Sequence, residues 1–575
     1  MRSGSSSQIV EKLANPRTAA LLLLALLFVA FWPFTFAELF WDDNLVIRPD
    51  GPIADLATLP KAFFARCILF SDAYQYPYYR PLIDILFILE YAVAGVHPFL
   101  YHLTNFVLHA ANTLMLFRLL LILLPETSQR SIAAFAGAAL FALHPIQCES
   151  VLWPAARPAV LGWFFMMLGF HAFAKLFQPS KFAPLLAFAA VGCFVASLLS
   201  KEIAVAVPLI ACMLFLMKSQ RPPRSAIFTA VAGVFALVVY LVLNSAIGSS
   251  AQSLGMLSIT TLIGRGIKLM GFYVWLLLWP LNLNPSYGPQ VGQAVGFTVA
   301  GVMFLLPVAV VVFVGLFRRT RLALLAAVGI LFFVGSSSLP LLGGQFTLAD
   351  RYTYQGMAGL GIAAAAILAA LGARTQSGAR ILAVLPLGVV VVITLLSLRQ
   401  SLYWISSESL WTRVVELEPT NRNAHMYLGG IEERRGKLKE AEAHFAAPLV
   451  GPQPPSEAVG NNLMALARVQ FALGRNDEAV ATYRDASQIP LFRNDAMLRA
   501  AIVEFSRGNR DAAQSLLRQF SDGGNETRNV YLNRALLALR MEKDTAAALQ
   551  WYRKAREKGA PPNADLEALA QAPSN

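Results

Sequence analysis

Long apolar runs alternate with short polar loops through the first 400 residues of the chain. An α-helix needs about 20 apolar residues to cross the roughly 30 Å hydrocarbon layer of a membrane, where every backbone polar group must be paired inside the segment. On this criterion we expect about eleven membrane-spanning helices, near residues 19–37, 101–124, 131–143, 158–177, 183–199, 203–217, 226–247, 294–317, 322–341, 354–372 and 380–398. The pattern predicts an all-α, polytopic helical bundle.

The loops between these runs differ in charge, and the difference predicts a topology. Lys and Arg are kept on the cytoplasmic side of a membrane more strongly than acidic residues are. If the N-terminal segment 1–18 is cytoplasmic, the strongly basic loops all fall on that side: Arg2/Lys12/Arg17, Arg118/Arg130, Lys175/Lys181, Lys218/Arg221/Arg224, Arg318/Arg319/Arg321 and Arg374/Arg380. The loop 38–98 and everything after residue 398 then lie outside.

Two segments need a separate interpretation. The first run follows basic residues as a signal peptide would, but its length and the absence of a small-residue cleavage site before Trp41 favour a retained anchor. The stretch 257–280 must begin and end on the outer side of the membrane, because otherwise the later basic loops would no longer lie on the cytoplasmic side. We therefore interpret it as a re-entrant or interfacial helix that carries Arg265 and Lys268 at the outer surface.

Composition agrees with a membrane protein. Hydrophobic residues make up 56% of the 575 residues and charged residues only 14%, which is more apolar surface than a soluble core would bury. The net charge of +13 lies in clusters between apolar runs, so it argues for topology and against nucleic acid as a partner. The four cysteines form no CxxC or Cys/His pattern, so no disulfide framework and no zinc site follows from them. No cofactor is required, and whether a divalent metal takes part stays open.

After residue 400 the composition changes, and a pattern recurs at intervals of about 34 residues, the length of a tetratricopeptide repeat (TPR). A small residue in the first helix, Gly at the turn, and then Ala and an aromatic residue in the second helix mark the places where paired helices touch. Matching positions are Gly429, Gly436, Ala441 and Phe445; Ala467, Gly474, Ala479, Tyr483 and Ala486; Ala501, Gly508 and Ala513; and Ala548, Tyr552 and Ala555. We predict a membrane domain at 19–400, a half-repeat connector at 401–419, a TPR α-solenoid at 420–562 and a tail at 563–575.

Ionisable residues gather in the predicted outer loops and not within the helices, which argues against a transporter or channel. They are Asp42 and Asp43; Arg80; Glu149 and Arg157; Lys201 and Glu202; and Asp350 and Arg351. An acidic pair at a helix end more commonly caps the helix than takes part in chemistry. For Glu149 and Arg157, an ion pair that closes the loop is as plausible as a functional role. Apolar residues before Asp42 nevertheless place both carboxylates at the membrane boundary, where desolvation makes them more basic.

These groups suit transfer of a sugar from a lipid phosphate. The phosphate is already a good leaving group, so the reaction needs a carboxylate to accept the proton of the incoming hydroxyl, and cations to hold the phosphate. An enzyme that uses a nucleotide sugar would instead need a soluble domain with an Asp-x-Asp metal motif, which the sequence lacks.

Several motifs, in the same order along nearly the whole chain, resemble those of the transmembrane and tetratricopeptide-repeat containing (TMTC) O-mannosyltransferases of the GT-C superfamily. They are Phe40-Trp41-Asp42-Asp43-Asn44, Tyr79-Arg80-Pro81-Leu82, His97-Pro98-Phe99, His102-Leu103-Thr104-Asn105 with His109, His144-Pro145 to Glu149, Ser200-Lys201-Glu202 and Asp350-Arg351-Tyr352-Thr353-Tyr354.

The resemblance implies an eleven-span fold with amphipathic helices in the 38–98 loop. It also implies a dolichyl- or undecaprenyl-phosphate sugar as donor, inversion at the sugar, and Ser/Thr hydroxyls of proteins as acceptors. Asp43 is then the expected base, with Asp42 beside it and Glu149 as a second acidic residue. Neighbours on a helix point about 100° apart, so we expect only one of the pair to face substrate. The donor phosphate would be bound by members of the set Arg80, Arg157, Lys201, Arg265 and Arg351, and substrate by Tyr79, His97, His102, His144, Glu202 and Tyr352.

The chain departs from the family in two places. The repeat array is short, which leaves the kind of acceptor open, and Pro158 follows Arg157 where an acidic residue is expected. Short loops favour a bacterial inner-membrane protein with a periplasmic site and TPR array, or an ER protein with a lumenal array if it is eukaryotic.

Three functions remain open at this point. The first is protein O-glycosylation, with a lipid-linked sugar, an acceptor protein on the TPR array and membrane lipid as partners. The second is the same chemistry with a lipid or polysaccharide acceptor. The third is a membrane-anchored TPR scaffold, although eleven spans exceed what an anchor needs.

Overall fold

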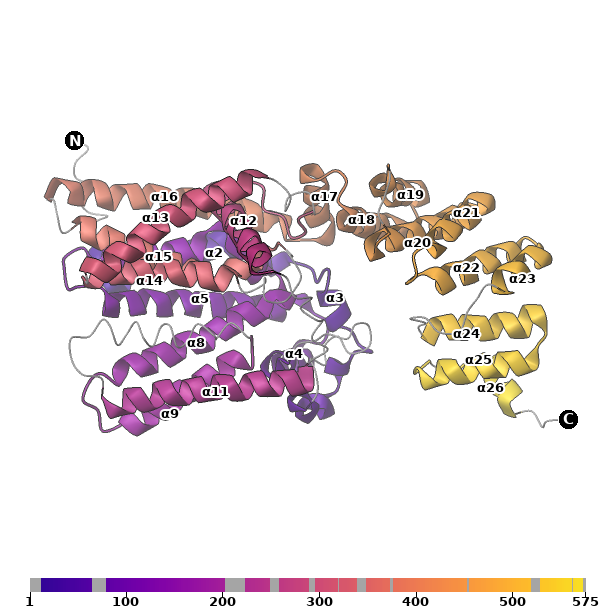
Figure 1. Cartoon of the computed structure of the whole chain (residues 1–575), viewed down its shortest axis with the longest axis horizontal. Helices are drawn as coiled ribbons and strands as arrows, with labels where there is room; N and C mark the ends of the chain where they lie inside the picture. The colour runs from indigo at the N-terminus through magenta and orange to yellow at the C-terminus, as the bar shows by residue number, and fades with distance from the viewer. Residues whose placement is uncertain are drawn as a thin grey trace. The chain divides into compact units, whose positions relative to one another are not determined.

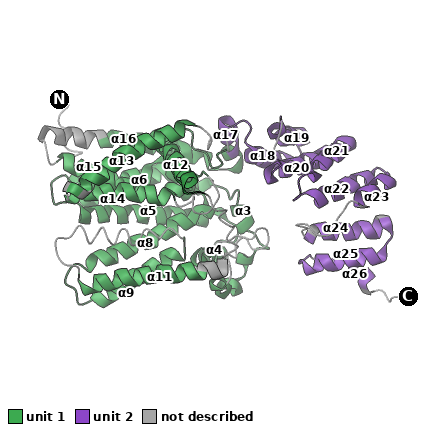
Figure 2. Ribbon diagram, viewed as in Figure 1, with its two compact units in different colours: residues 1–410 green, residues 411–575 purple. Residues whose placement is uncertain are grey.

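The computed structural model describes residues 12–64, 79–201, 223–248, 258–288, 295–318, 320–338, 348–372, 376–451, 455–518, 528–560 and 562–571. The described residues contain no β-strand, and they form two compact units, residues 1–410 and 411–575 (Figures 1 and 2). The prediction of an all-α membrane bundle followed by a TPR solenoid is confirmed. The finer domain boundaries drawn from the sequence stay predictions.

Unit 1 contains the apolar helices. They are α2 (Pro16–Phe31), α5 (Pro98–Leu123), α6 (Arg130–Leu143), α8 (Arg157–Lys175), α9 (Ala183–Leu198), α11 (Arg224–Gly248), α12 (Ile259–Leu278), α13 (Val295–Arg318), α14 (Arg321–Ser338), α15 (Tyr354–Gly372) and α16 (Gln376–Tyr403). Short helices join them at one end: η1 (Trp32–Phe36), α3 (Asp43–Val46), η2 (Pro52–Ala54), η3 (Leu56–Phe63), α4 (Pro81–Ala94), η5 (Pro145–Gln147), α7 (Cys148–Leu152), η6 (Pro154–Ala156) and η10 (Asp350–Thr353).

Nine helices of the described chain are long and apolar enough to cross a membrane. A tenth span is formed if α6 and the segment 145–152 are taken together, although they meet at a 49° bend where Pro145 interrupts the helix. The helix α9 is apolar but shorter, and the expected span at 203–217 lies outside the described residues.

The helix α12 corresponds to the stretch that we interpreted as re-entrant or interfacial. With 20 residues it has the length and composition of a span, which the sequence interpretation did not allow for. In Figure 1 it is drawn foreshortened, whereas α5, α11 and α16 lie lengthwise across the view, so α12 crosses the direction of the bundle. Its depth in the membrane stays a prediction.

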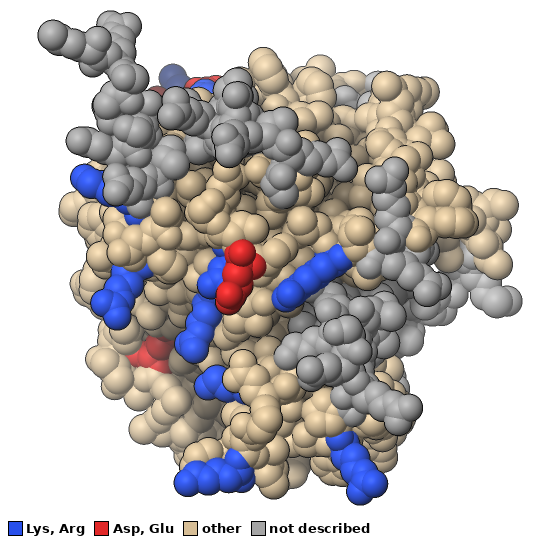
Figure 3. Space-filling model, turned by 90° about the vertical axis from the view of Figure 1, so that its left-hand side faces the viewer, with Lys and Arg blue, Asp and Glu red and all other residues tan. Residues whose placement is uncertain are grey.

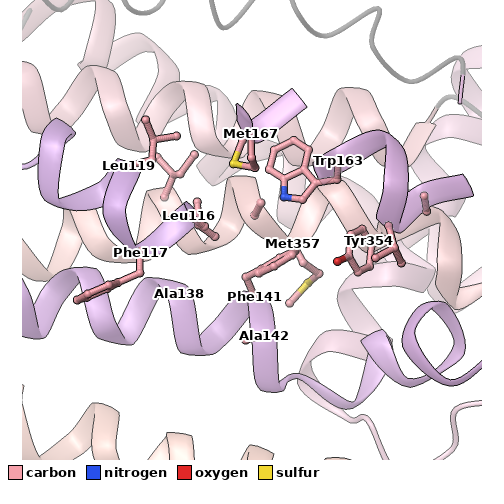
Figure 4. Close-up of a cluster of buried hydrophobic side chains, with 14 of the residues drawn as sticks. Leu116, Phe117, Leu119, Ala138, Phe141, Ala142, Trp163, Met167, Tyr354 and Met357 are labelled. Carbon is pink, nitrogen blue, oxygen red and sulfur yellow. The ribbon is translucent and has the colours of Figure 1, made fainter. Parts of the chain in front are cut away.

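Close helix crossings hold the centre of unit 1 together. A Cβ on Gly137 of α6 would lie 2.3 Å from the carbonyl oxygen of Gly361 on α15, so only glycine allows the two backbones to approach this closely. Around this crossing, side chains from α5, α6, α8 and α15 interlock in an apolar cluster (Figure 4) that includes Leu116, Phe141 and Met357.

The two ends of the bundle differ in chemistry. At one end the start of α6 meets the N-terminal segment, where Ser131 Oγ donates to Leu13 O at 2.7 Å, and the start of α14 meets the end of α5, where Arg321 donates to Ile122 O. Lys and Arg predominate among the charged side chains on this face (Figure 3). This agrees with the basic loops sharing one side, and the acidic and cationic motifs lie at the opposite helix ends.

Unit 2 is a series of antiparallel helix pairs. Its elements are α17 (Ser407–Leu417), which begins in unit 1, α18 (Arg422–Arg434), α19 (Leu438–Ala446), η11 (Ala447–Leu449), α20 (Glu457–Ala472), α21 (Asn476–Ser487), α22 (Arg493–Ser506), α23 (Arg510–Arg518), α24 (Arg528–Leu537), η12 (Ala538–Glu542, π-helical), α25 (Thr545–Glu557) and α26 (Ala564–Gln571). The predicted turn glycines Gly436, Gly474 and Gly508 all have positive φ. In the last repeat Lys543 takes the left-handed conformation with φ 52°, after a π-helical turn.

Candidate active site

The two adjacent acidic residues of the first outer loop point into different surroundings. Asp43 begins α3 and is fully buried; its Oδ1 accepts the N–H of Ala155 at 2.9 Å and its Oδ2 accepts the N–H of Phe40 at 3.4 Å. Asp42 is half-buried and lies in the field of Arg351. Of the pair, Asp42 therefore keeps exposed surface and Asp43 does not.

Burial changes the proton affinity of both carboxyls. Desolvation raises the pKa of Asp43 well above 3.8, against the two backbone N–H donors that favour its ionised form. Burial also raises the pKa of Asp42, and the positive charge of Arg351 opposes this rise. A carboxylate with a raised pKa is a stronger base than one in water, which is what removing a hydroxyl proton requires.

Glu149 and Arg351 form a pair across the site. The Arg351 guanidinium makes an ion pair with Glu149, and the Arg351 backbone N–H donates to the other carboxylate oxygen at 2.8 Å. The Glu149 side chain is buried, while that of Arg351 keeps 25% of its surface exposed. Arg351 is thus a fixed cation with an accessible side, as a phosphate ligand must be.

Arg157 has a different partner from the one that sequence suggested. It makes an ion pair with Glu90 of α4, so the Glu149–Arg157 pair is wrong. Its Nε donates to Asn105 Oδ1 at 2.7 Å and its Nη2 donates to Tyr101 O at 2.8 Å, and the side chain has no exposed surface. Arg157 joins α4, α5 and α8 behind the site and offers no face to a lipid phosphate.

The other predicted cations lie on separate elements of unit 1 and are all half-buried. Lys201 is half-buried, and its Nζ lies 5.9 Å from the ring centroid of Tyr352. The Arg351 guanidinium carbon lies 5.0 Å from the same centroid. Arg80 is half-buried directly before α4, and Arg265 is half-buried on α12. Lys201 and Arg351 therefore both lie beside the ring of Tyr352.

The remaining predicted substrate residues are mostly engaged with the protein. The Tyr79 hydroxyl donates to Phe63 O, and His102 Nε2 lies 3.1 Å from Glu38 O. His144 accepts the N–H of Ile146 and contacts Leu277 O. His97 is exposed before α5, and Glu202 lies outside the described residues.

Sequence reasoning missed two residues at the centre of this arrangement, Trp153 and Tyr287. The Trp153 indole stacks on Trp41 with ring centroids 4.5 Å apart, and the Arg351 guanidinium carbon lies 5.2 Å from the Trp153 ring. Tyr287 donates to the buried carboxylate of Asp350 at 2.7 Å, directly before Arg351. Neither residue falls in a charged motif: Trp153 follows Glu149 by four positions, whereas the segment 279–293 around Tyr287 contains no acidic residue that would have drawn attention to it.

Fold and site together define a polytopic helical membrane protein with a TPR unit and an acid and cation centre at one end of its bundle.

A family model for the tetratricopeptide repeat matches residues 406–456 and 498–564. The chain is 24% identical over 447 residues to a Caenorhabditis elegans protein O-mannosyl-transferase, an alignment that covers 74% of this chain and 61% of the relative. It is 26% identical over 166 residues to the mouse protein O-mannosyl-transferase TMTC3, covering 28% and 17%, and 32% identical over 133 residues to Drosophila melanogaster Tmtc1, covering 22% and 15%.

The resemblance to TMTC proteins that the motifs indicated is confirmed by these relatives. The chain spans about 61% of the length of the worm relative and a smaller part of the others.

Proposed function

We propose that this chain is a membrane glycosyltransferase that moves mannose from a polyprenyl-phosphate carrier to Ser or Thr hydroxyls of proteins outside the cytoplasm. The relatives are named as protein O-mannosyl-transferases, which supports mannose as the sugar and protein as the acceptor. The observation that carries the proposal is the half-buried Asp42 carboxylate in the field of the partly exposed Arg351.

The reaction follows from the charges at this site. The acceptor oxygen attacks the anomeric carbon from the face opposite the phosphate, and the bond between that carbon and the phosphate oxygen breaks, so the configuration inverts. The electron pair leaves with the phosphate, which Arg351 and Lys201 bind, and the hydroxyl proton passes to Asp42. No metal is needed in this scheme because the cations balance the phosphate charge.

Accessibility decides which acidic residue we assign as base. A base must come within hydrogen-bond reach of the hydroxyl, and Asp43 has no exposed surface while both its oxygens bind backbone N–H groups. The base predicted from the sequence was Asp43. We now assign Asp42 as the base and Asp43 as the residue that holds the loop against Ala155.

Transfer by the full-length protein in lipid nanodiscs tests this assignment. With polyprenyl-phosphate mannose and secreted-protein acceptors, Asp42→Asn should lower kcat by at least about a hundredfold, since general-base catalysis is worth about 10² to 10⁴. Asp50→Asn is the matched control, because Asp50 is an exposed acidic residue of the same loop. Wild-type activity in Asp42→Asn with loss in Asp43→Asn would return the base to Asp43.

The acceptor is tested separately. Intact-mass analysis of envelope proteins from a deletion strain should show proteins lighter by one or more hexose residues. A change confined to lipids or polysaccharides would instead favour a non-protein acceptor.

A further inference from the structure

The residue before the acidic pair has a strained backbone. Trp41 has φ 54°, and among the described residues Lys543 is the one other non-glycine residue with positive φ. This conformation brings Cβ close to the backbone carbonyl and is costly for a bulky side chain, so it persists only where its surroundings enforce it. The strain falls at the point where the chain turns Asp42 and Asp43 in different directions.

A ring stack enforces this conformation. The indoles of Trp41 and Trp153 are almost parallel, with an interplanar angle of 4° and centroids 4.5 Å apart. Trp153 is itself fixed, because it is buried and its carbonyl accepts Asn105 Nδ2 at 3.1 Å. The Trp41 ring is thus held by a residue of the bundle that lies far from its own loop in the sequence.

Trp153 also connects the acidic loop to the cation. Its ring contacts the Arg351 guanidinium, and two residues later Ala155 donates its N–H to Asp43. One short segment, residues 153–155, therefore touches the acidic loop at two points and the cation at a third. Movement of Trp153 would displace the carboxylates and Arg351 together.

We propose that Trp41 and Trp153 are positioning residues that fix the separation of the acidic pair from Arg351. This inference rests on the proposed function, in which the base must lie on one side of the sugar and the phosphate cation on the other. A displacement of about 1 Å between reacting groups can cost about a hundredfold in rate. The stack holds this geometry before substrate arrives.

Substitution of each tryptophan by phenylalanine and by alanine shows whether an aromatic ring at that position is needed. Trp41→Phe and Trp153→Phe keep an aromatic face and should retain kcat within about threefold of wild type, whereas Trp41→Ala and Trp153→Ala should lose about a hundredfold. The Michaelis constants distinguish positioning from general damage. Trp41→Ala should leave the donor KM near wild type because it affects the acidic loop, while Trp153→Ala should also raise the donor KM because it frees Arg351.

Trp275→Ala is the matched control. Trp275 and Trp279 form another aromatic pair of unit 1, with centroids 6.4 Å apart, and Trp275 is 48% exposed. Its removal should change neither kcat nor KM. Exciton coupling in the circular dichroism spectrum, lost in Trp41→Phe and Trp153→Phe alike, reports the indole stack without any assay of activity.

The outcomes are distinct. Wild-type kcat and KM in Trp41→Ala and Trp153→Ala, or equal losses in Trp275→Ala, would overturn the positioning role while leaving the proposed function intact. No transfer by the wild-type protein, with the exciton signal present, would overturn the proposed function itself.

Discussion

At the residue scale, the sequence indicated the acidic pair but not which of its two carboxylates is buried and which is exposed. Neighbouring residues in regular structure point in predictable directions, whereas a left-handed Trp41 between Phe40 and Asp42 follows from no propensity. The conformation of Trp41 depends on its contact with Trp153, which lies 112 residues later in the sequence. Sequence could therefore predict which residue types form the site but not which carboxylate stays open.

Burial of Asp43 predicts a pH dependence of stability. Its pKa is raised above 3.8 in the folded protein, so the folded state binds this proton more tightly than the unfolded state does. The stabilising contribution is therefore complete below about pH 3.8 and is lost as the pH rises through the raised pKa, by about 1.4 kcal/mol per pH unit within that window.

Asp43→Asn, which is neutral throughout, should lack this loss. Thermal unfolding of the detergent-solubilised protein should be measured between about pH 4 and about pH 8. The Tm of the wild type should fall relative to that of the variant as the pH rises. Asp50→Asn serves as the control for removal of one exposed charge. Parallel curves for wild type and Asp43→Asn would contradict the prediction.

At the element scale, local patterns predicted most of the repeat unit. Three turn glycines of the TPR pattern have the positive φ that the pattern requires, while the last turn uses Lys543 and a π-helical turn, so its glycine signal was missing. The same reasoning failed for the pairing of Glu149. Proximity along the chain made Arg157 one candidate partner, whereas the partner is Arg351, brought alongside by the packing of η10 against α7 and η5.

Two adjacent glycines of α18 give a matched test of repeat packing. A Cβ at Gly429 would lie 2.5 Å from the buried ring of Phe445, whereas a Cβ at Gly430 meets only the flexible end of Arg434 at 3.6 Å. Gly429→Ala should destabilise the first repeat by about 1–3 kcal/mol through overpacking. Gly430→Ala should stabilise it by up to about 1 kcal/mol, since alanine is the better helix former.

Hydrogen exchange of residues 422–446 in the full-length protein measures both variants locally. Faster exchange in Gly429→Ala and slower exchange in Gly430→Ala is the expected result. Equal protection in the two variants would mean that Phe445 moves aside without cost.

At the scale of the whole molecule, hydropathy and charge predicted an all-α membrane unit followed by a helical repeat unit. The interpretation of α12 as re-entrant or interfacial stays a prediction, because its 20 residues are also sufficient for a span and hydropathy alone does not give the direction of a helix. All candidate site residues belong to unit 1, and the TPR match belongs to the chain from residue 406 onward.

This division predicts separable effects on the two substrates. A protein truncated after residue 419 keeps the acid and cation centre, so its donor KM should stay near wild type. Its acceptor KM should rise by about tenfold or more if unit 2 binds the acceptor, because uniform binding energy appears in KM. Short Ser/Thr peptides, too small to reach unit 2, provide the control and should be glycosylated equally by both proteins.

An equal rise in both Michaelis constants would contradict this prediction. It would assign unit 2 a role in supporting the fold of the bundle.

The pairing of Glu149 with Arg351 has a consequence for turnover in the proposed reaction. The sugar-linked carrier is a phosphodiester with one negative charge, whereas the spent carrier is a monoester that holds up to about two at neutral pH. An isolated cation would therefore bind the product more tightly than the substrate. Because Glu149 already offsets part of the positive charge of Arg351, the preference for the spent carrier is reduced, and the carrier can leave the protein for recycling.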